Sequence, residues 1–108
     1  MNIAQIAKMA QQVQAQMAQA QDELKDTTLE VTAGGGAVRI VITGAQEIRH
    51  VQIDPSAVDP DEVEMLQDLM MSAMNEAIGR SKTLERERMA SIAGGMGMPG
   101  MPGLPGFG

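Results

Sequence analysis

The stretch that decides the fold is GGGAVRIVITGAQEIRHVQIDP, residues 34–55. It predicts two β-strands joined by a turn at Gly44. In the first strand the apolar residues recur at every second position, as expected of a strand with one buried face, and they are Val38, Ile40 and Ile42. In the second strand the parity of the apolar residues changes between Ile48 and Val51, which predicts a β-bulge or an irregular edge.

A further strand is predicted just before this stretch, at residues 27–33, where apolar residues again alternate with polar ones. Three glycines, residues 34–36, then lead into the next strand. A phosphate-binding loop is the alternative interpretation, but such loops lead from a strand into a helix N-terminus. The glycines are therefore expected to supply positive φ angles in a hairpin turn.

The chain opens with a predicted helix of about 24 residues, because Asn2 and Gln5 have the spacing of a capping box. Apolar residues recur along it in a 3-4 alternation over about three heptads: Ile3, Ile6, Ala10, Val13, Met17, Ala20 and Leu24. This stripe predicts packing on the sheet and the second helix, or on a second subunit. An extended, self-standing coiled coil is the alternative, and its nearly uncharged flanks would specify pairing only weakly.

A second long helix is predicted from Pro60 to about Ala93. Asp59 can cap it, Pro60 suits its first position and Glu62 its third. Roughly 33 residues make such a helix about 50 Å long, so part of it must extend beyond a three-stranded sheet. Gly79 marks a place where it can bend. The acidic residues of its first half could instead form a metal site, but no histidine joins them and capping accounts for the first three.

Composition limits the chain to one domain of 108 residues. It contains 11 Met and one Phe but no Trp or Tyr, so its core is small and a second copy of the chain is an expected source of further apolar contacts. We assign residues 1–93 to a dimerising domain. Residues 94–108 consist of Gly, Pro, Met, Leu and Phe, which predicts a flexible tail, with weak contact to a partner as the alternative.

Several functional classes are excluded or disfavoured. The chain has no cysteine, which rules out disulfides, Cys-ligated zinc and thiol catalysis. No apolar run is long enough to span a bilayer and no secretory signal is present, so a soluble, untargeted protein is expected. The one histidine, His50, lies in a strand and no catalytic motif occurs. We therefore expect no enzyme activity, cofactor, metal or small-molecule substrate.

Charge argues both for and against a nucleic-acid partner. The net charge is −6, which disfavours binding to phosphates. The second half of the second helix is nevertheless locally basic, with Arg80, Lys82, Arg86 and Arg88 against Glu85 and Glu87. A solvated helix end with local ion pairs is one interpretation of this segment. An arm that contacts phosphates is the other.

Several spaced motifs, in order along nearly the whole chain, resemble the YbaB/EbfC family of bacterial nucleoid-associated proteins. After an uncharged, Gln- and Met-rich first helix come V-x-I-x-I-T-G at residues 38–44, V-x-I-D-P at 51–55, E-x-L-x-D-L at 64–69 and A-x-N-E-A at 73–77. A basic stretch, Met-Ala-Ser at 89–91 and the Gly/Pro/Met tail complete the pattern. The match of several motifs together is more specific than any one of them.

The resemblance implies an α+β fold: an α-β-β-β-α protomer with a three-stranded antiparallel sheet, forming a tweezer-like homodimer with projecting helical arms. It also implies binding of double-stranded DNA with little sequence preference, in the cytoplasmic nucleoid, and a role in nucleoid organisation or gene regulation. The basic residues that could make the contacts on the two helices are Lys8, Lys25, Arg80, Lys82, Arg86 and Arg88. Arg39 and Arg49 are weaker candidates, since they can pair with Glu30 or Glu47 across the sheet.

A second hypothesis, favoured by the net acidity, is a protein-interaction module that does not bind DNA. It would act with replication or recombination proteins, with its heptad helix and Met-rich tail docking onto a partner. Such a module would show no binding to DNA even at about 50 mM salt, where electrostatic contacts to phosphates are strongest.

Overall fold

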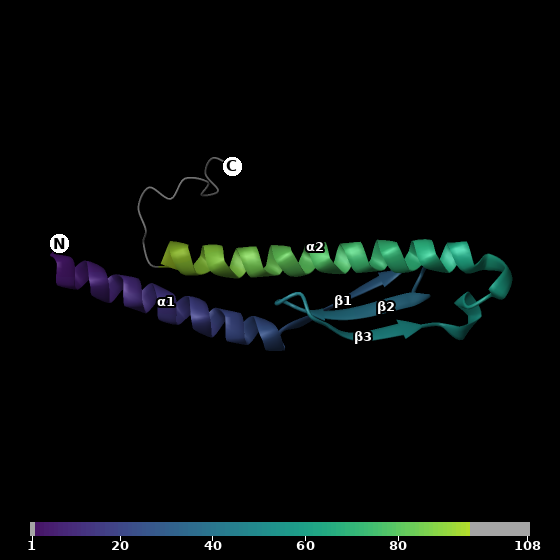
Figure 1. The fold of residues 1–108 in the computed structure, drawn as a ribbon, viewed down its shortest axis with the longest axis horizontal. Helices are drawn as coiled ribbons and strands as arrows, with labels where there is room; N and C mark the ends of the chain where they lie inside the picture. Colours follow the sequence, from purple (N-terminus) through teal and green to yellow (C-terminus); the bar gives the residue numbers. More distant parts are fainter. Residues whose placement is uncertain (1, 96–108) are drawn as a thin grey trace, which may run out of the picture.

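The computed structural model describes residues 2–95, and the predicted tail at 94–108 therefore falls almost entirely outside them. The elements, in chain order, are α1 (Ile3–Asp26), β1 (Thr28–Ala33), β2 (Val38–Thr43), β3 (Ile48–Ile53), two 3₁₀ turns (Pro55–Ala57 and Pro60–Glu62) and α2 (Val63–Gly95). This order confirms the predicted α+β fold with an α-β-β-β-α arrangement (Figure 1).

The three strands form one antiparallel sheet in the order β1-β2-β3. The glycine turn between β1 and β2 has φ angles of 64°, 68° and 97° at Gly34, Gly35 and Gly36, so the predicted need for positive φ is confirmed. The predicted bulge is also present. Val41 lies opposite His50 and Ile42 lies opposite Ile48, so the register between β2 and β3 changes by one residue at this point.

The core lies between one face of the sheet and α2. Its fully buried residues come from β1, β2 and the middle of α2, and they are Val31, Val38, Ile40, Ile42, Ala73 and Ala77. The two alanines carry the smallest apolar side chains, which lets the helix backbone approach the strands closely. Figure 1 shows α2 running the length of the sheet and continuing beside α1. The middle of α2 is thus the part that the sheet holds.

Helix α1 begins as predicted and is buried only in part. The backbone N–H of Gln5 donates to Oδ1 of Asn2 over 2.8 Å, and the backbone N–H of Asn2 donates to Oε1 of Gln5 over 3.2 Å, which completes the capping box. At the other end of the heptad stripe Ala20 and Leu24 are buried, whereas Ile3 is exposed. The predicted packing of the stripe therefore holds for its C-terminal half within one chain.

Helix α2 differs from the prediction at both ends. The Asp59 carboxylate accepts a hydrogen bond from the Asp61 backbone N–H over 2.9 Å, and residues 60–62 form a 3₁₀ turn, so the α-helix starts at Val63. This contact spans two residues, as in an Asx turn, and tightens the entry to the helix. The helix is continuous through Gly79, where a bend was considered, and extends to Gly95 instead of Ala93.

A buried serine fixes the point at which α2 leaves the sheet. The Ser81 hydroxyl donates to the Thr43 carbonyl over 2.6 Å and accepts from both the backbone and the side-chain amide of Gln46, each over 3.1 Å. Gln46 lies in the β2–β3 turn with a positive φ of 60°, a conformation that non-glycine residues adopt at a cost. Ser81 therefore supports a strained turn and attaches the helix to it.

We expect Ser81→Ala to lower the free energy of unfolding by about 1–3 kcal/mol, because it leaves a buried carbonyl and a turn N–H without partners. Urea denaturation followed by circular dichroism measures this change. Ser72→Ala, at an exposed position of the same helix, is the matched control and should change stability by no more than about 0.5 kcal/mol. Equal stability of the two variants would contradict the role given to Ser81.

Candidate nucleic-acid interface

The second half of α2 and the second half of α1 form a two-helix arm next to the sheet. The described part of the chain is elongated, with extents of 69 × 29 × 16 Å. In Figure 1 the two helices lie side by side and run in opposite directions. Nη2 of Arg88 on α2 donates to Oε2 of Glu23 on α1 over 2.9 Å and joins the two helices. This ion pair therefore connects the two helices of the arm near its junction with the sheet.

Three of the six predicted DNA-binding residues are paired with carboxylates. Arg88 pairs with Glu23, Lys25 with Asp22 at 3.5 Å, and Arg80 with Glu76 at 3.7 Å. All three pairs are about half exposed or more, and such surface pairs contribute only about 0–1 kcal/mol each. These cations are locally neutralised in the protein, although little energy is needed to separate them from their partners.

The other three predicted residues have no such partner. Among residues 2–95, no carboxylate oxygen lies within 4.0 Å of the charged groups of Lys8, Lys82 and Arg86. Lys82 and Arg86 are exposed and four residues apart on α2, so they lie one above the other on one face of the helix. We call this pair the basic row.

The basic row faces away from α1. Arg88 follows Arg86 by two residues, which is a rotation of about 200° around a helix, and Arg88 points to α1 through Glu23. Nη2 of Arg86 donates to Oγ1 of Thr83 over 3.2 Å, which holds the guanidinium near the helix surface. Lys8 lies apart from the row, on α1, in a shallow hollow with Gln5, Met9 and Gln12. The predicted residues thus do not form one patch.

Both strand arginines pair with the predicted carboxylates, Arg39 across two strands and Arg49 with Glu47 just before its own strand. Nη1 of Arg39 lies 3.4 Å from Oε2 of Glu30, and Nε of Arg49 lies 2.6 Å from Oε1 of Glu47. Arg49 also donates from Nη2 to the backbone carbonyl of Lys25 over 3.0 Å and so ties β3 to the end of α1. Both arginines therefore have structural partners and are poor candidates for phosphate contacts.

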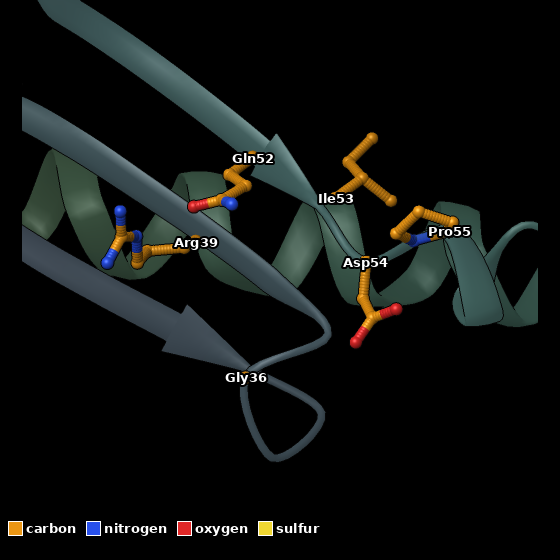
Figure 2. Close-up of a pocket in the computed structure, with 6 residues that line it drawn as sticks. All are labelled: Gly36, Arg39, Gln52, Ile53, Asp54 and Pro55. Carbon is orange, nitrogen blue, oxygen red and sulfur yellow. The ribbon is translucent and has the colours of Figure 1, made fainter.

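A hollow of about 310 Å³ lies at the glycine-turn end of the sheet, between β2, β3 and the turn that follows β3. Figure 2 shows Arg39 and Gln52 on neighbouring strands, with the Asp54 carboxylate at the far end of the hollow from the Arg39 guanidinium. The Ser56 backbone N–H and hydroxyl each donate to Oδ1 of Asp54 over 2.9 Å. These two hydrogen bonds lower the pKa of the Asp54 carboxyl below its usual value of 3.8.

Comparison with known proteins gives a consistent result. The model of the YbaB/EbfC DNA-binding family matches residues 1–96. The chain belongs to this family. A nucleoid-associated protein of Ruminiclostridium cellulolyticum is 48% identical over 96 residues, which cover 89% of this chain and 84% of that protein. One of Chloroflexus aurantiacus is 47% identical over 89% of this chain and 96% of that protein.

The fold of this YbaB/EbfC family member has a solved counterpart. An uncharacterized protein of Helicobacter pylori matches with a TM-score of 0.71 at 28% sequence identity, covering 89% of this chain and 97% of that chain. The resemblance inferred from the spaced motifs is therefore confirmed by sequence and by structure. The family is a DNA-binding family and not an enzyme family.

The structure also shows an apolar surface that this YbaB/EbfC member leaves open. Ile48 and Val51 of β3 lie opposite the core residues Ile42 and Ile40, so they share the sheet face on which α2 packs. Helix α2 packs against β1 and β2, and Ile48 and Val51 are left 40% and 42% exposed. We use the name apolar patch for five of the exposed apolar residues of β3 and α2, namely Ile48, Val51, Met71, Met74 and Ile78.

On α2 the apolar patch borders the buried face of the helix. Met74 and Ile78 follow the buried Ala73 and Ala77 directly, and Met71 lies on the same side as they do. The sequence assigned Met74 and Ile78 to the apolar face of this helix. The sequence did not show which residues of this face the sheet buries and which it leaves exposed, because that depends on which strands the helix packs against.

Residues 2–95 contain no group of three or more His, Asp or Glu side chains placed to hold a metal ion. This range includes the acidic start of α2, where a metal site was the alternative to capping. In the same range, no helix has both the length and the apolar content required to cross a lipid bilayer.

We expect Ser56→Ala to raise the pKa of Asp54 toward 3.8, because it removes the hydroxyl donor and leaves only the backbone N–H. A carboxyl whose pKa is lowered by folding stabilises the native state above its unfolded pKa, and that contribution is lost as pH falls through the native pKa. The advantage of wild type over Ser56→Ala should therefore shrink below about pH 4. An NMR titration of the Asp54 carboxyl carbon checks this, and identical titration curves would contradict it.

Proposed function

We propose that the protein is a homodimer that binds double-stranded DNA mainly through phosphates, with little sequence preference, in the cytoplasmic nucleoid. The observation that carries this proposal is the basic row. Lys82 and Arg86 are exposed, lack a carboxylate partner among the described residues, and lie on a projecting helical arm of a protein from a DNA-binding family. Its role would be nucleoid organisation or gene regulation.

Phosphate contact explains how an acidic protein can bind DNA. The net charge is −6, yet the acidic residues between Asp54 and Asp68 lie at the other end of the molecule from the tip of the arm (Figure 1). The Debye length is about 8 Å at physiological ionic strength, so carboxylates farther away than this are largely screened from a phosphate at the basic row. Local charge therefore governs the contact more than the total does.

Little sequence preference follows from the kind of contact. Lys and Arg side chains that reach phosphate oxygens position the protein on the duplex but do not read the bases. The other predicted residues have secondary roles in this proposal. Lys8 adds charge on α1, while Lys25, Arg80 and Arg88 must first leave their exposed carboxylate partners, at a cost of about 0–1 kcal/mol each.

Dimerisation through the apolar patch supports the same function. Two residues of the patch, Ile48 and Val51, lie opposite core residues on the sheet, and in a two-fold dimer each copy presents the same patch to the other. Burying Ile48, Val51 and Ile78 in this way would add a second layer of apolar contacts to a core that consists mostly of Val, Ile and Ala. The dimer would carry two basic rows, and therefore four unpaired cations from α2.

The second candidate is the protein-interaction module that does not bind DNA and that acts with replication or recombination proteins. The exposed N-terminal half of the α1 stripe favours it, since exposed apolar side chains at helical spacing suit a partner helix. The two candidates differ in one simple measurement. The module would leave labelled duplex DNA unbound at about 50 mM salt, where phosphate contacts are strongest.

We expect log affinity for duplex DNA to fall with log salt concentration at a slope of about −3.6, which corresponds to four phosphate contacts per dimer. The double variant Lys82→Ala/Arg86→Ala should bring this slope toward zero and weaken binding at low salt by at least about tenfold. Fluorescence anisotropy with a labelled duplex over a salt series measures both quantities.

The matched control for this experiment is Arg80→Ala/Arg88→Ala, which removes the same charge from the same helix but at paired positions. It should change the slope by less than about one unit. Equal losses in the two double variants would mean that net charge, and not the basic row, determines binding. Unchanged binding in the Lys82/Arg86 variant would remove the row from the interface.

Dimerisation is tested by placing a charge in the apolar patch. Val51→Asp/Ile78→Asp should raise the dimer dissociation constant by a factor on the order of 100 or more, because carboxylates buried in an apolar interface lose hydration without gaining partners. Sedimentation equilibrium over a concentration series measures the constant. Met65→Asp, at an exposed position of α2 outside the patch, is the control and should leave the dimer intact. A dimer of unchanged strength in the double variant would place the interface elsewhere.

A further inference from the structure

At the start of α1, two residues of the heptad stripe, Ile3 and Ile6, are exposed together with the neighbouring Met9, and we call these three residues the exposed stripe. Ile3 is 85% exposed, Ile6 is 53% exposed and Met9 is 38% exposed, whereas Val13 and Met17 farther along the heptad stripe are half-buried. Exposure therefore rises steadily toward the N-terminus. A single exposed apolar residue needs no explanation, but three in a row at helical spacing form a surface that a partner can cover.

The stripe becomes exposed at the point where α2 ends. From the contact between Glu23 and Arg88, α2 continues for seven residues to Gly95, which an antiparallel partner places opposite about Gln16. The part of α1 from Ile3 to Gln16 therefore extends beyond α2 by about 20 Å. Helix α2 ends beside this overhang, and its axis points in the direction of the N-terminus of α1 (Figure 1).

The sequence that continues from there has a period of three. Residues 98–107 read MPGMPGLPGF, with one apolar side chain at every third position: Met98, Met101, Leu104 and Phe107. A residue that precedes proline is biased toward extended or polyproline II backbone angles. Polyproline II has three residues per turn, so in that conformation all four apolar side chains lie along one edge.

We propose that residues 96–108 dock along the exposed stripe of α1 as a polyproline II segment, with this apolar edge against Ile3, Ile6 and Met9. At about 3.1 Å per residue the segment reaches roughly 40 Å, which is more than the overhang requires. Docking needs no reversal of the chain. Proline and a preformed extended backbone reduce the entropy that such a segment loses on binding.

Charge and connectivity both favour this segment as the occupant. Residues 94–108 contain no charged side chain, and Lys8 is the only charged residue of α1 before Asp22, so docking desolvates almost no charge. A segment attached at Gly95 is also present at an effective concentration in the millimolar range, whereas a second copy of α1 must be supplied by dilute protein. The segment therefore competes well for the stripe.

The test uses the full chain with the apolar edge removed by Met101→Ser/Leu104→Ser/Phe107→Ser. Amide hydrogen exchange should become about fivefold faster at residues 6–12 of α1 and stay unchanged in β2 and in the middle of α2. The Met9 methyl resonance should shift as well. Val58→Ser/Val63→Ser/Met65→Ser removes three exposed apolar side chains far from α1 and should leave both signals as in wild type.

A reciprocal variant tests the same contact from the other side. In Ile6→Ser the methyl resonances of Met98 and Met101 should move toward their positions in a short peptide of residues 96–108, and the core amides report whether the chain stays folded. The proposal is overturned if exchange at residues 6–12 is the same with and without the apolar edge. It is also overturned if that protection rises with protein concentration independently of residues 96–108, because a second copy would then be the occupant.

Discussion

The difference in length between the sheet and α2 is the constraint on which the rest of this structure depends. Six-residue strands span about 20 Å, whereas the 33 residues of α2 span about 50 Å. The strands can hold only part of the helix, and they hold the part where Ala73 and Ala77 allow close approach. Beyond Ser81 the helix has no sheet beneath it, so it pairs with α1 and becomes an arm. The arm is thus a consequence of the fold.

The sequence predicted the elements well because their signals are local. A capping box, strands with alternating apolar residues, a glycine turn and a parity change each involve residues only a few positions apart, and each was confirmed. The predicted start of α2 was three residues too early. Asp59 can cap either an α-helix or a 3₁₀ turn, and in the structure it caps the 3₁₀ turn at residues 60–62. The sequence marked Gly79 as a possible bend in α2, but the helix is continuous through this residue.

The parts that escaped prediction depend on contacts between residues far apart in the chain. Arg88 looked like one more cation of a basic segment, but Glu23, sixty-five residues away, binds it. Ser81 resembles any other serine in a helix until Thr43 and Gln46 are placed beside it. The six candidate residues were therefore ranked equally from the sequence. The structure divides them into paired and unpaired cations, and its helical geometry places two of the unpaired ones on a single face.

The α2 residues of the apolar patch and the basic row lie on one helix, and this would link the proposed dimerisation to the proposed DNA binding. Within the described residues a single subunit offers two unpaired cations on α2, and because each phosphate contact weakens as salt rises, we expect two contacts to give only weak binding at physiological salt. In the proposed dimer a second subunit would double this number. It would also fix the distance between the two rows, because three residues of the apolar patch lie on the same helix. The second row then meets DNA that the first has already brought near, so its contacts are gained at a high effective concentration. On this view DNA binding requires the dimer. Dimerisation would add apolar contacts to a small core and would also increase the number of cations that reach the DNA.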